Sequence, residues 1–388
     1  METTTASSPS PAPATSPFAS AEGLNRILLA LFGISDKISD ILFSPGKPPQ
    51  VELNSQLRAA KVPGMEALSG QHTAEIARLL TQGHAVAGQS LSENGSADIS
   101  YAISDRLRFR VNIFKQQGGL AVVMRVIPPT IPTMESLGLP DELQKIAGLK
   151  NGIVLVTGPT GSGKSSTLAA VIDRINENRP EHILTIEDPV EFRHKHKKGT
   201  VHQREVHTDT PNFALALRAA LRQAPKVILV GEMRDMETIE VAFEAAETGH
   251  LVLSTLHTID CAKTVDRVIG VFPKNEEQFV RTRLAQTFRY VVSQRLLPRA
   301  DGKSRVAAIE VLKSTLRTRE YIEKGEREGK SLVDAMNDGE VDGMQSFDRV
   351  LERMARNGEI TVATALGYST NRGNLRLNLH DIAGAEDD

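Results

Sequence analysis

Hydrophobic and polar positions alternate along the first third of the chain in patterns that predict a small α+β domain. Two stretches repeat apolar residues with the 3.6-residue period of a helix, and four are apolar runs or alternate with the period of two typical of half-buried strands. The predicted helices cover residues 24–32 and 71–82, and the predicted strands cover residues 39–43, 50–53, 107–113 and 120–127. The last two strands form a predicted hairpin that places Arg108, Arg110 and Arg125 at polar positions.

After the proline-rich stretch at residues 128–132, apolar strands alternate with amphipathic helices. The predicted strands lie at residues 153–157, 182–186, 227–230 and 251–253, and two predicted helices lie at residues 213–223 and 236–247. This alternation predicts an α/β core with a parallel sheet, in which ligand-binding groups gather at the carboxyl ends of the strands. A helical region ends the chain, and Ser346 is the expected cap of a helix that begins at Phe347.

Composition shifts along the chain suggest five segments. Residues 1–20 are rich in Ser, Thr, Pro and Ala, so we expect a disordered tail there. Prolines stiffen the stretch before the core and exclude regular structure from it. We therefore expect an N-terminal domain at residues 21–130, a linker at 131–140, the α/β core at 141–315 and a C-terminal helical region at 316–388.

Between the first core strand and the helix that follows it lies a glycine-rich loop, within the sequence VLVTGPTGSGKSST at residues 154–167. It fits the phosphate-binding pattern G-x-x-x-x-G-K-[ST], in which backbone N–H groups and a helix N-terminus surround phosphate oxygens. Lys164 would reach the β- and γ-phosphates, and the Ser165 hydroxyl would bind Mg²⁺. The predicted nucleotide-binding residues are Gly158, Pro159, Thr160, Gly161, Ser162, Gly163, Lys164, Ser165, Ser166 and Thr167.

Three further side chains stand at or just beyond the carboxyl ends of predicted core strands. Glu232 follows the apolar run at residues 227–230, where a carboxylate can point at the water that attacks a phosphate; the alternative is a surface acid that caps the next helix. Glu187 ends an earlier strand and can hold a water of Mg²⁺, although Asp-Pro after it is also a turn signal. His257 either reaches a phosphate or serves as a structural hydrogen-bonding group.

Arginines and histidines outside this set leave alternatives open. The hairpin arginines form either a solvated face or a set of cations that reaches a nucleotide between domains or subunits. The basic, histidine-rich stretch at residues 193–198, together with His202 and His207, could bind a metal but is interpreted as a solvated loop, because no acid or cysteine completes a closed metal site.

Overall composition limits the classes of partner that we expect this chain to bind. The formal net charge is −2 and no basic stretch is interleaved with aromatic residues, so we expect no nucleic-acid partner. The chain has one cysteine, Cys261, which excludes a disulfide framework and fits a reduced, cytoplasmic setting. No signal-peptide pattern and no apolar run of membrane-spanning length are present, so we expect no direct membrane insertion.

Taken together, these motifs resemble the secretion and pilus motor ATPases, and most closely the type IV pilus retraction ATPases of the PilT/PilU type. The resemblance runs from about residue 24 to the C-terminus. Besides the phosphate loop it rests on an Asp box at residues 183–192, a Walker B segment at 227–235, a His box at 247–258 and the short matches at 109–112 and 343–345.

The resemblance implies a RecA-like ATPase core, a PAS-like N-terminal domain and a homohexamer that uses ATP and Mg²⁺ to drive pilus retraction. It makes Glu232 the water-activating residue, Glu187 an acid near Mg²⁺ and His257 a γ-phosphate sensor. Arg110 and Arg125 become the cations that clamp the phosphates. It also implies a cytoplasmic protein docked on a pilus platform protein of the inner membrane.

Two alternatives to a retraction motor stay open. One is an accessory ATPase of the PilU type, and the other is an assembly or type II secretion ATPase that exports subunits. Residues 316–328 keep little of the usual retraction signature, and Ala224-Pro225-Lys226 replaces the usual Asp-Pro-Asp. The absence of a cysteine-rich insertion favours the retraction branch.

Overall fold

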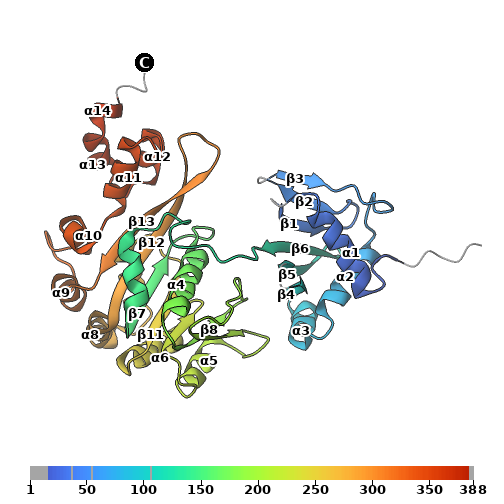
Figure 1. The fold of residues 1–388 in the computed structure, drawn as a ribbon, viewed down its shortest axis with the longest axis horizontal. Helices are drawn as coiled ribbons and strands as arrows, with labels where there is room; N and C mark the ends of the chain where they lie inside the picture. The colour runs from blue at the N-terminus through green and yellow to red at the C-terminus, as the bar shows by residue number, and fades with distance from the viewer. Residues whose placement is uncertain (1–15, 36–37, 54–55, 105–106, 384–388) are drawn as a thin grey trace, which may run out of the picture. The chain divides into compact units, whose positions relative to one another are not determined.

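The computed structural model describes residues 16–35, 38–53, 56–104 and 107–383. The chain divides into two compact units, Met1–Pro129 and Thr130–Asp388 (Figure 1). Each unit has hydrophobic cores of its own, so each can be understood from its own residues.

The first unit is an antiparallel six-stranded sheet, with the strand order β3-β2-β1-β6-β5-β4, that shares one core with helices. Leu28 of α1 and Ile76 of α2 belong to that core, as does Phe109 of β5. The elements are α1 (Ala21–Phe32), β1 (Ile38–Phe43), β2 (Gln50–Leu53), β3 (Gln56–Ala59), α2 (Gly70–Thr81), α3 (Ala85–Glu93), β4 (Ser96–Ser104), β5 (Leu107–Gln116) and β6 (Gly119–Ile127). The predicted hairpin is β5 and β6. The elements β3, α3 and β4 were not predicted, although Ala97, Ile99 and Tyr101 of β4 alternate with Asp98 and Ser100.

The predicted tail is wrong for its last residues. Residues 1–15 lie outside the described part of the chain. Phe18, however, is fully buried and meets the Phe43 ring edge-on, with 6.3 Å between ring centroids. Ser20 caps α1 by accepting a hydrogen bond from the Gly23 N–H. The prediction of disorder rested on the polar composition of residues 1–20. It did not allow for the burial of this single aromatic side chain, which fixes the end of the stretch on the core.

The second unit is built on a seven-stranded sheet in the order β13-β12-β7-β11-β10-β8-β9, with every neighbouring pair parallel except β12 and β13. The strands are β7 (Gly152–Thr157), β8 (His182–Glu187), β9 (Thr200–Glu205), β10 (Val227–Val230), β11 (Leu251–Leu256), β12 (Phe288–Pro298) and β13 (Arg305–Lys313). This confirms the predicted α/β core. His202, expected in a solvated loop, instead lies in the edge strand β9, which pairs with β8.

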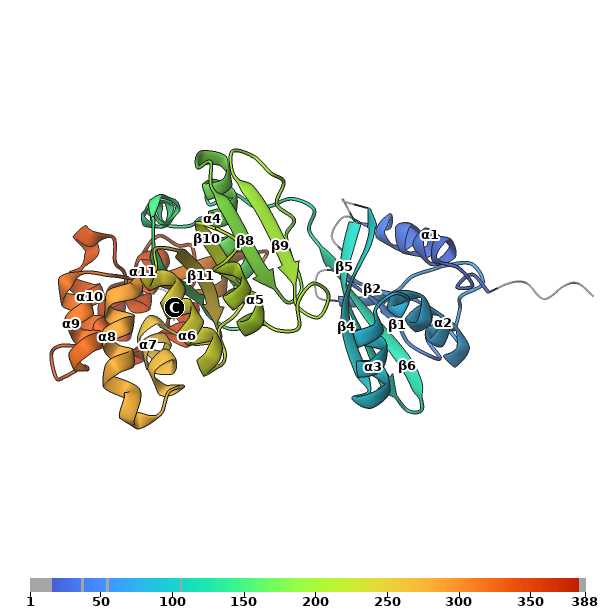
Figure 2. The same ribbon diagram turned by 90° about the horizontal axis from the view of Figure 1, so that it is seen from below.

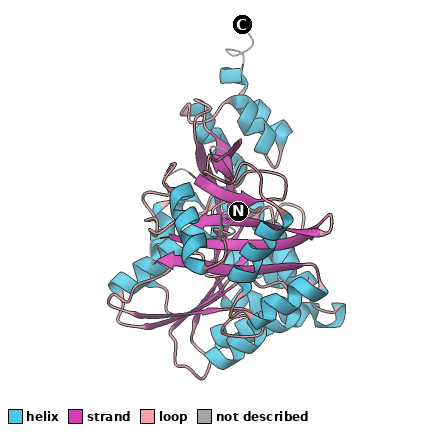
Figure 3. Ribbon diagram, turned by 90° about the vertical axis from the view of Figure 1, so that its right-hand side faces the viewer, coloured by secondary structure: helices cyan, strands magenta, loops and turns pink. Residues whose placement is uncertain are grey.

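Helices cover both faces of this sheet (Figure 2). Figure 3 distinguishes helices from strands by colour. The 3₁₀ helix η1 and α4 share one hydrophobic cluster with the strands, while α5 to α8 share the other. These helices are η1 (Asp141–Gly148), α4 (Lys164–Asn178), α5 (Phe213–Ala220), α6 (Met236–Glu247), α7 (Cys261–Gly270), η2 (Lys274–Glu276) and α8 (Glu277–Thr287). Strands β7, β10 and β11 in the middle of the sheet are buried on both faces, as parallel strands between helical layers must be.

The C-terminal region is helical, as predicted, with α9 (Leu316–Lys324), α10 (Leu332–Asp338), η3 (Glu340–Asp342), α11 (Phe347–Arg356), α12 (Val362–Tyr368), α13 (Arg372–Asn378) and α14 (His380–Ala383). Helices α11 to α13 pack on Leu297 and Ala308 of the β12–β13 hairpin. Ser346 occupies the cap position of α11 but makes no capping hydrogen bond, because its hydroxyl bonds to Asn337 instead.

Candidate functional site

The phosphate loop spans the six residues between the end of β7 and the start of α4, as its motif predicts. Gly158 has φ of 141°, and a Cβ there would lie 2.3 Å from the Gln294 carbonyl oxygen and 2.6 Å from Ser162 Oγ. Gly163 caps α4 with φ of 93°. Only glycine combines this backbone with such close neighbours, so the loop geometry is a direct consequence of the sequence.

Lys164 lies over this loop. Its ammonium donates hydrogen bonds to the carbonyl oxygens of Gly158 and Pro159, each at 3.0 Å. Burial lowers the Lys164 pKa, while the nearby carboxylates of Glu191 and Glu232 oppose that shift. Ser162 Oγ is buried and has no partner among the described residues. A cation, a free hydroxyl and a helix N-terminus therefore meet where a phosphate fits.

Glu232 stands two residues beyond the carboxyl end of β10, and hydrogen bonds to β11 hold that segment in place. Ser254 Oγ donates to the Val230 carbonyl and Thr255 Oγ1 donates to the Gly231 carbonyl, both at 2.7 Å. The Met233 N–H donates to the Thr255 carbonyl at 3.2 Å. Because backbone is bonded before and after it, Glu232 projects from a fixed edge of the sheet.

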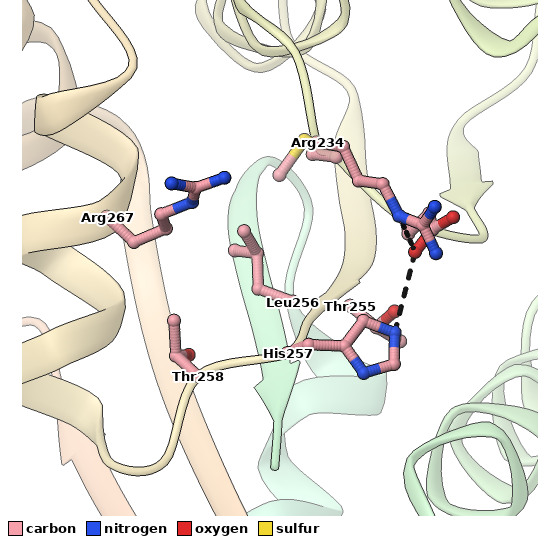
Figure 4. Close-up of a pocket in the computed structure, with 8 residues that line it drawn as sticks. Arg234, Thr255, Leu256, His257, Thr258 and Arg267 are labelled. Carbon is pink, nitrogen blue, oxygen red and sulfur yellow. Dashed lines mark ion pairs between the residues drawn. The ribbon is translucent and has the colours of Figure 1, made fainter. Parts of the chain in front are cut away.

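The Glu232 carboxylate interacts with two cationic or basic groups (Figure 4). Arg234 Nε lies 2.6 Å from Glu232 Oε2, and His257 Nε2 lies 3.5 Å from the same oxygen. These residues line a cavity of about 380 Å³, and Arg267 of α7 lines it as well. Burial lowers the pKa of His257, and the Lys164 cation adds to that effect. The His257 imidazole and the Lys164 ammonium can both donate hydrogen bonds to an anionic ligand.

Glu187 ends β8, as predicted, within a polar network. Thr185 Oγ1 and Gln203 Nε2 donate to Glu187 Oε1 at 2.6 Å and 3.0 Å. Burial of this carboxyl group raises its pKa. Glu191, four residues further on, is the acid of this segment that acts on Lys164. The Mg²⁺ role of Glu187 stays a prediction.

Arg110 and Arg125 are directly opposite each other on β5 and β6 of the first unit, as the hairpin predicts. Arg125 Nε also pairs with Asp40 Oδ1 at 3.0 Å. Arg108, expected on the same polar face, is 6% exposed, so it is not part of a solvated surface. A phosphate-clamping role for Arg110 and Arg125 stays a prediction.

Sequence reasoning assigned no role to three charged residues around the site. Glu191 and Arg234 lie inside the Asp box and the Walker B segment. The sequence therefore gives their positions along the chain, but not the directions in which their side chains point. Arg267 reaches the cavity from α7, which no short motif predicts. Residues of this kind are brought to a site by helix packing rather than by spacing along the chain.

Parallel sheet, phosphate loop and strand-end acid together define the class of this protein as a P-loop nucleotide-binding protein. Residues 68–344 match the type II/IV secretion system protein family. The chain belongs to that family.

Individual relatives align over most of their length. The type IV pilus retraction ATPase PilT of Pseudomonas aeruginosa is 43% identical over 86% of this chain and 94% of its own. The type IV pilus ATPase PilU of the same organism is 39% identical over 90% of this chain and 89% of its own. A crystal structure of the pilus retraction motor PilT with bound ADP superposes with a TM-score of 0.82, at 39% identity, over 91% of this chain and 99% of that one.

Within the described residues, none of the helices is both long enough and apolar enough to traverse a bilayer.

Proposed function

We propose that this chain is an ATP-hydrolysing motor that powers type IV pilus retraction and thereby twitching motility. The observation that carries the proposal is the position of Glu232, a strand-end carboxylate near the phosphate-loop Lys164 and paired with His257. The similarity to PilT over nearly the full length of that protein supports retraction as the work performed.

In this function the phosphate loop binds ATP through its backbone N–H groups and the Lys164 ammonium. The free Ser162 hydroxyl and the glycine geometry fit a phosphate there. The Ser165 hydroxyl, and Glu187 through a water, would hold Mg²⁺, which neutralises charge on the phosphates when bound. Glu232 orients the attacking water and accepts its proton, while His257 contacts the γ-phosphate.

The assembled form completes the proposal. We infer a homohexamer in which Arg110 and Arg125 of the N-terminal unit clamp the phosphates, so that hydrolysis changes how that unit packs. The hexamer acts in the cytoplasm, docked on a pilus platform protein at the inner membrane. The exposed guanidinium of Arg125, held by Asp40 at its Nε, supports such a contact.

An accessory role like that of PilU is the second candidate, because PilU matches a similar share of this chain. The measurement that separates the two candidates is steady-state ATP turnover by the purified protein, together with pilus retraction in a deletion strain. A motor gives enzyme-level turnover, whereas an accessory ATPase would turn over ATP no faster than ATP hydrolyses free in solution. Deletion of a retraction motor leaves excess unretracted pili. An assembly ATPase would instead leave the strain without pili.

Two substitutions test the site chemistry. We expect Glu232→Gln to bind nucleotide but to lose turnover by about 100-fold or more, because the water loses its base and orienting acceptor. Lys164→Ala should lose nucleotide binding itself. The control is Glu237→Gln, an exposed acid of α6 paired with Arg218 at 3.0 Å, which should hydrolyse ATP normally. Wild-type turnover by the Glu232 variant would overturn the assignment.

A further inference from the structure

A buried glutamate outside the nucleotide site joins two helices. Glu310 of β13 is 3% exposed. Its Oε2 accepts the Cys261 N–H at 2.7 Å, and its Oε1 accepts the Phe347 N–H at 3.1 Å. Cys261 begins α7 and Phe347 begins α11. A buried carboxylate is costly unless hydrogen-bonded, so this group is stable only while both helix ends stay in place.

The segment that Glu310 holds is the one that follows His257. Helix α7 begins at Cys261, four residues after His257. The N–H group that Glu310 binds therefore stands at the C-terminal end of a short loop that starts at His257. The near end is held by a 2.6 Å contact between Thr258 Oγ1 and Thr264 Oγ1. Thr264 Oγ1 also lies 3.2 Å from Thr157 Oγ1, at the end of β7 directly before the phosphate loop. One end of this loop is therefore held by threonines next to the phosphate loop, and the other end is held by Glu310 of β13.

Arg295 of β12 joins the same loop to the same C-terminal helices independently. Its Nη2 donates to the Ile259 carbonyl at 3.2 Å, and its guanidinium lies 3.8 Å from the centroid of the Phe347 ring. Its Nη1 donates to the Tyr368 carbonyl of α12. The loop after His257 is therefore connected to α11 twice, once through a carboxylate and once through a guanidinium.

We propose that Glu310 is a positioning residue for ATP hydrolysis: it holds the loop at residues 257–260 against the first turn of α11, so that the C-terminal helices set the position of His257. The proposal rests on the proposed function, in which His257 contacts the γ-phosphate. Glu310 does not touch the nucleotide. Movement of α11 would be transmitted to His257 through this carboxylate and through Arg295.

The ionisation of Glu310 provides a signature in the pH profile. Burial raises the Glu310 pKa to about 7, and the two backbone N–H groups oppose that shift. The charged or titratable groups that face it are Asp260 and Cys261 of the α7 segment and Arg295 of β12; Asp348 of α11 faces Arg295 in turn. The ionised carboxylate is the stronger acceptor, so kcat should rise as pH increases through about 7.

The test compares Glu310→Gln with Glu340→Gln, a control whose side chain is 78% exposed and pairs with Arg349. Glutamine keeps the shape but replaces one acceptor with an NH₂ group. We expect kcat to fall about tenfold with little change in KM, and the pH-dependent rise near 7 to disappear. In a His257→Ala background, Glu310→Gln should have little further effect on kcat, because both changes act through the same side chain.

An unchanged kcat in the folded Glu310→Gln protein would overturn the proposal, as would an equal tenfold loss in the His257→Ala background. If Glu310→Gln does not fold, Arg295→Ala decides the question by the same two measurements. Failure of the proposed function is distinguishable, because the wild-type protein would then show no enzyme-level ATP turnover. If only the role of His257 is wrong, His257→Ala alone would hydrolyse ATP like the wild type.

Discussion

At the scale of single residues, burial and neighbouring charges shift the pKa values of several side chains around the site. Lys164 and His257 both have lowered pKa values, mainly because of burial. Glu187 has a raised pKa for the same physical reason. Glu232 differs from these in carrying a direct ion pair with Arg234, whose Nε lies 2.6 Å from Glu232 Oε2.

The raised pKa of Glu187 predicts a specific effect on stability. As pH increases, the unfolded chain loses this proton at the ordinary value while the folded protein still keeps it. Its contribution to the free energy of unfolding is therefore fully present below the ordinary pKa and is lost as pH rises through the folded value. Glu187→Gln should flatten the pH dependence of unfolding, measured by urea denaturation from about pH 4 to about pH 8. A slope identical to that of the wild type would contradict this.

Gly158 carries a second prediction at this scale. In Gly158→Ala, an alanine would have to adopt a φ of 141°, and its Cβ would lie 2.3 Å from the Gln294 carbonyl oxygen and 2.6 Å from Ser162 Oγ. We therefore expect nucleotide binding to be lost. The free energy of unfolding should fall by about 1–3 kcal/mol or more. The matched control is Gly161→Ala, which has φ of 78° but nothing within 4 Å, and should cost only about 1 kcal/mol. Nucleotide titration and urea denaturation measure both effects, and equal losses would contradict the steric explanation.

At the scale of elements, the site is an edge where several strands end together. Thr157 is level with Leu256 in the pairing of β7 with β11, and Val230 is level with both Ser254 and Ile186. The segments after these strands must therefore meet, although they are far apart in the sequence. Helix α6 stabilises this edge because it starts at Met236, directly after the loop that carries Glu232, and packs under the sheet.

Packing of α6 gives the third prediction. Phe243 is 1% exposed. Its ring centroid lies 6.5 Å from that of Phe272 and 5.1 Å from the guanidinium carbon of Arg283. Phe243→Ala should lower the free energy of unfolding by about 3–5 kcal/mol, because it leaves a cavity between helix and sheet. Met236→Ala on the same helix, 41% exposed, is the control and should stay within about 0.5 kcal/mol of the wild type. Chemical denaturation followed by circular dichroism distinguishes the two outcomes.

At the scale of the whole molecule, the chain is two units with separate cores. The first core contains residues from α1, α2 and every strand of its sheet except β3. The second unit distributes its hydrophobic residues over clusters on the two faces of one sheet and under the C-terminal helices. Such an organisation lets each unit fold from its own contacts.

The fourth prediction follows from that separation. A fragment comprising Met1–Pro129 should fold alone and unfold in one cooperative transition, because its core is complete within it. Phe109→Ala in the fragment should lower its stability by about 3–5 kcal/mol, since Phe109 is fully buried. A gradual, non-cooperative loss of circular dichroism signal on adding urea would show that the unit depends on the rest of the chain.

The sequence by itself determined the phosphate loop, the α/β core and the strand-end positions of Glu187, Glu232 and His257. These features are encoded locally, because glycine conformations, helix starts and apolar runs are decided within a few neighbouring residues. Tertiary structure alone decided that β9 pairs with β8, that Phe18 belongs to a core, and that Glu310 joins α7 to α11. Such contacts depend on strand order and helix packing between distant segments, and no local pattern in one chain specifies them.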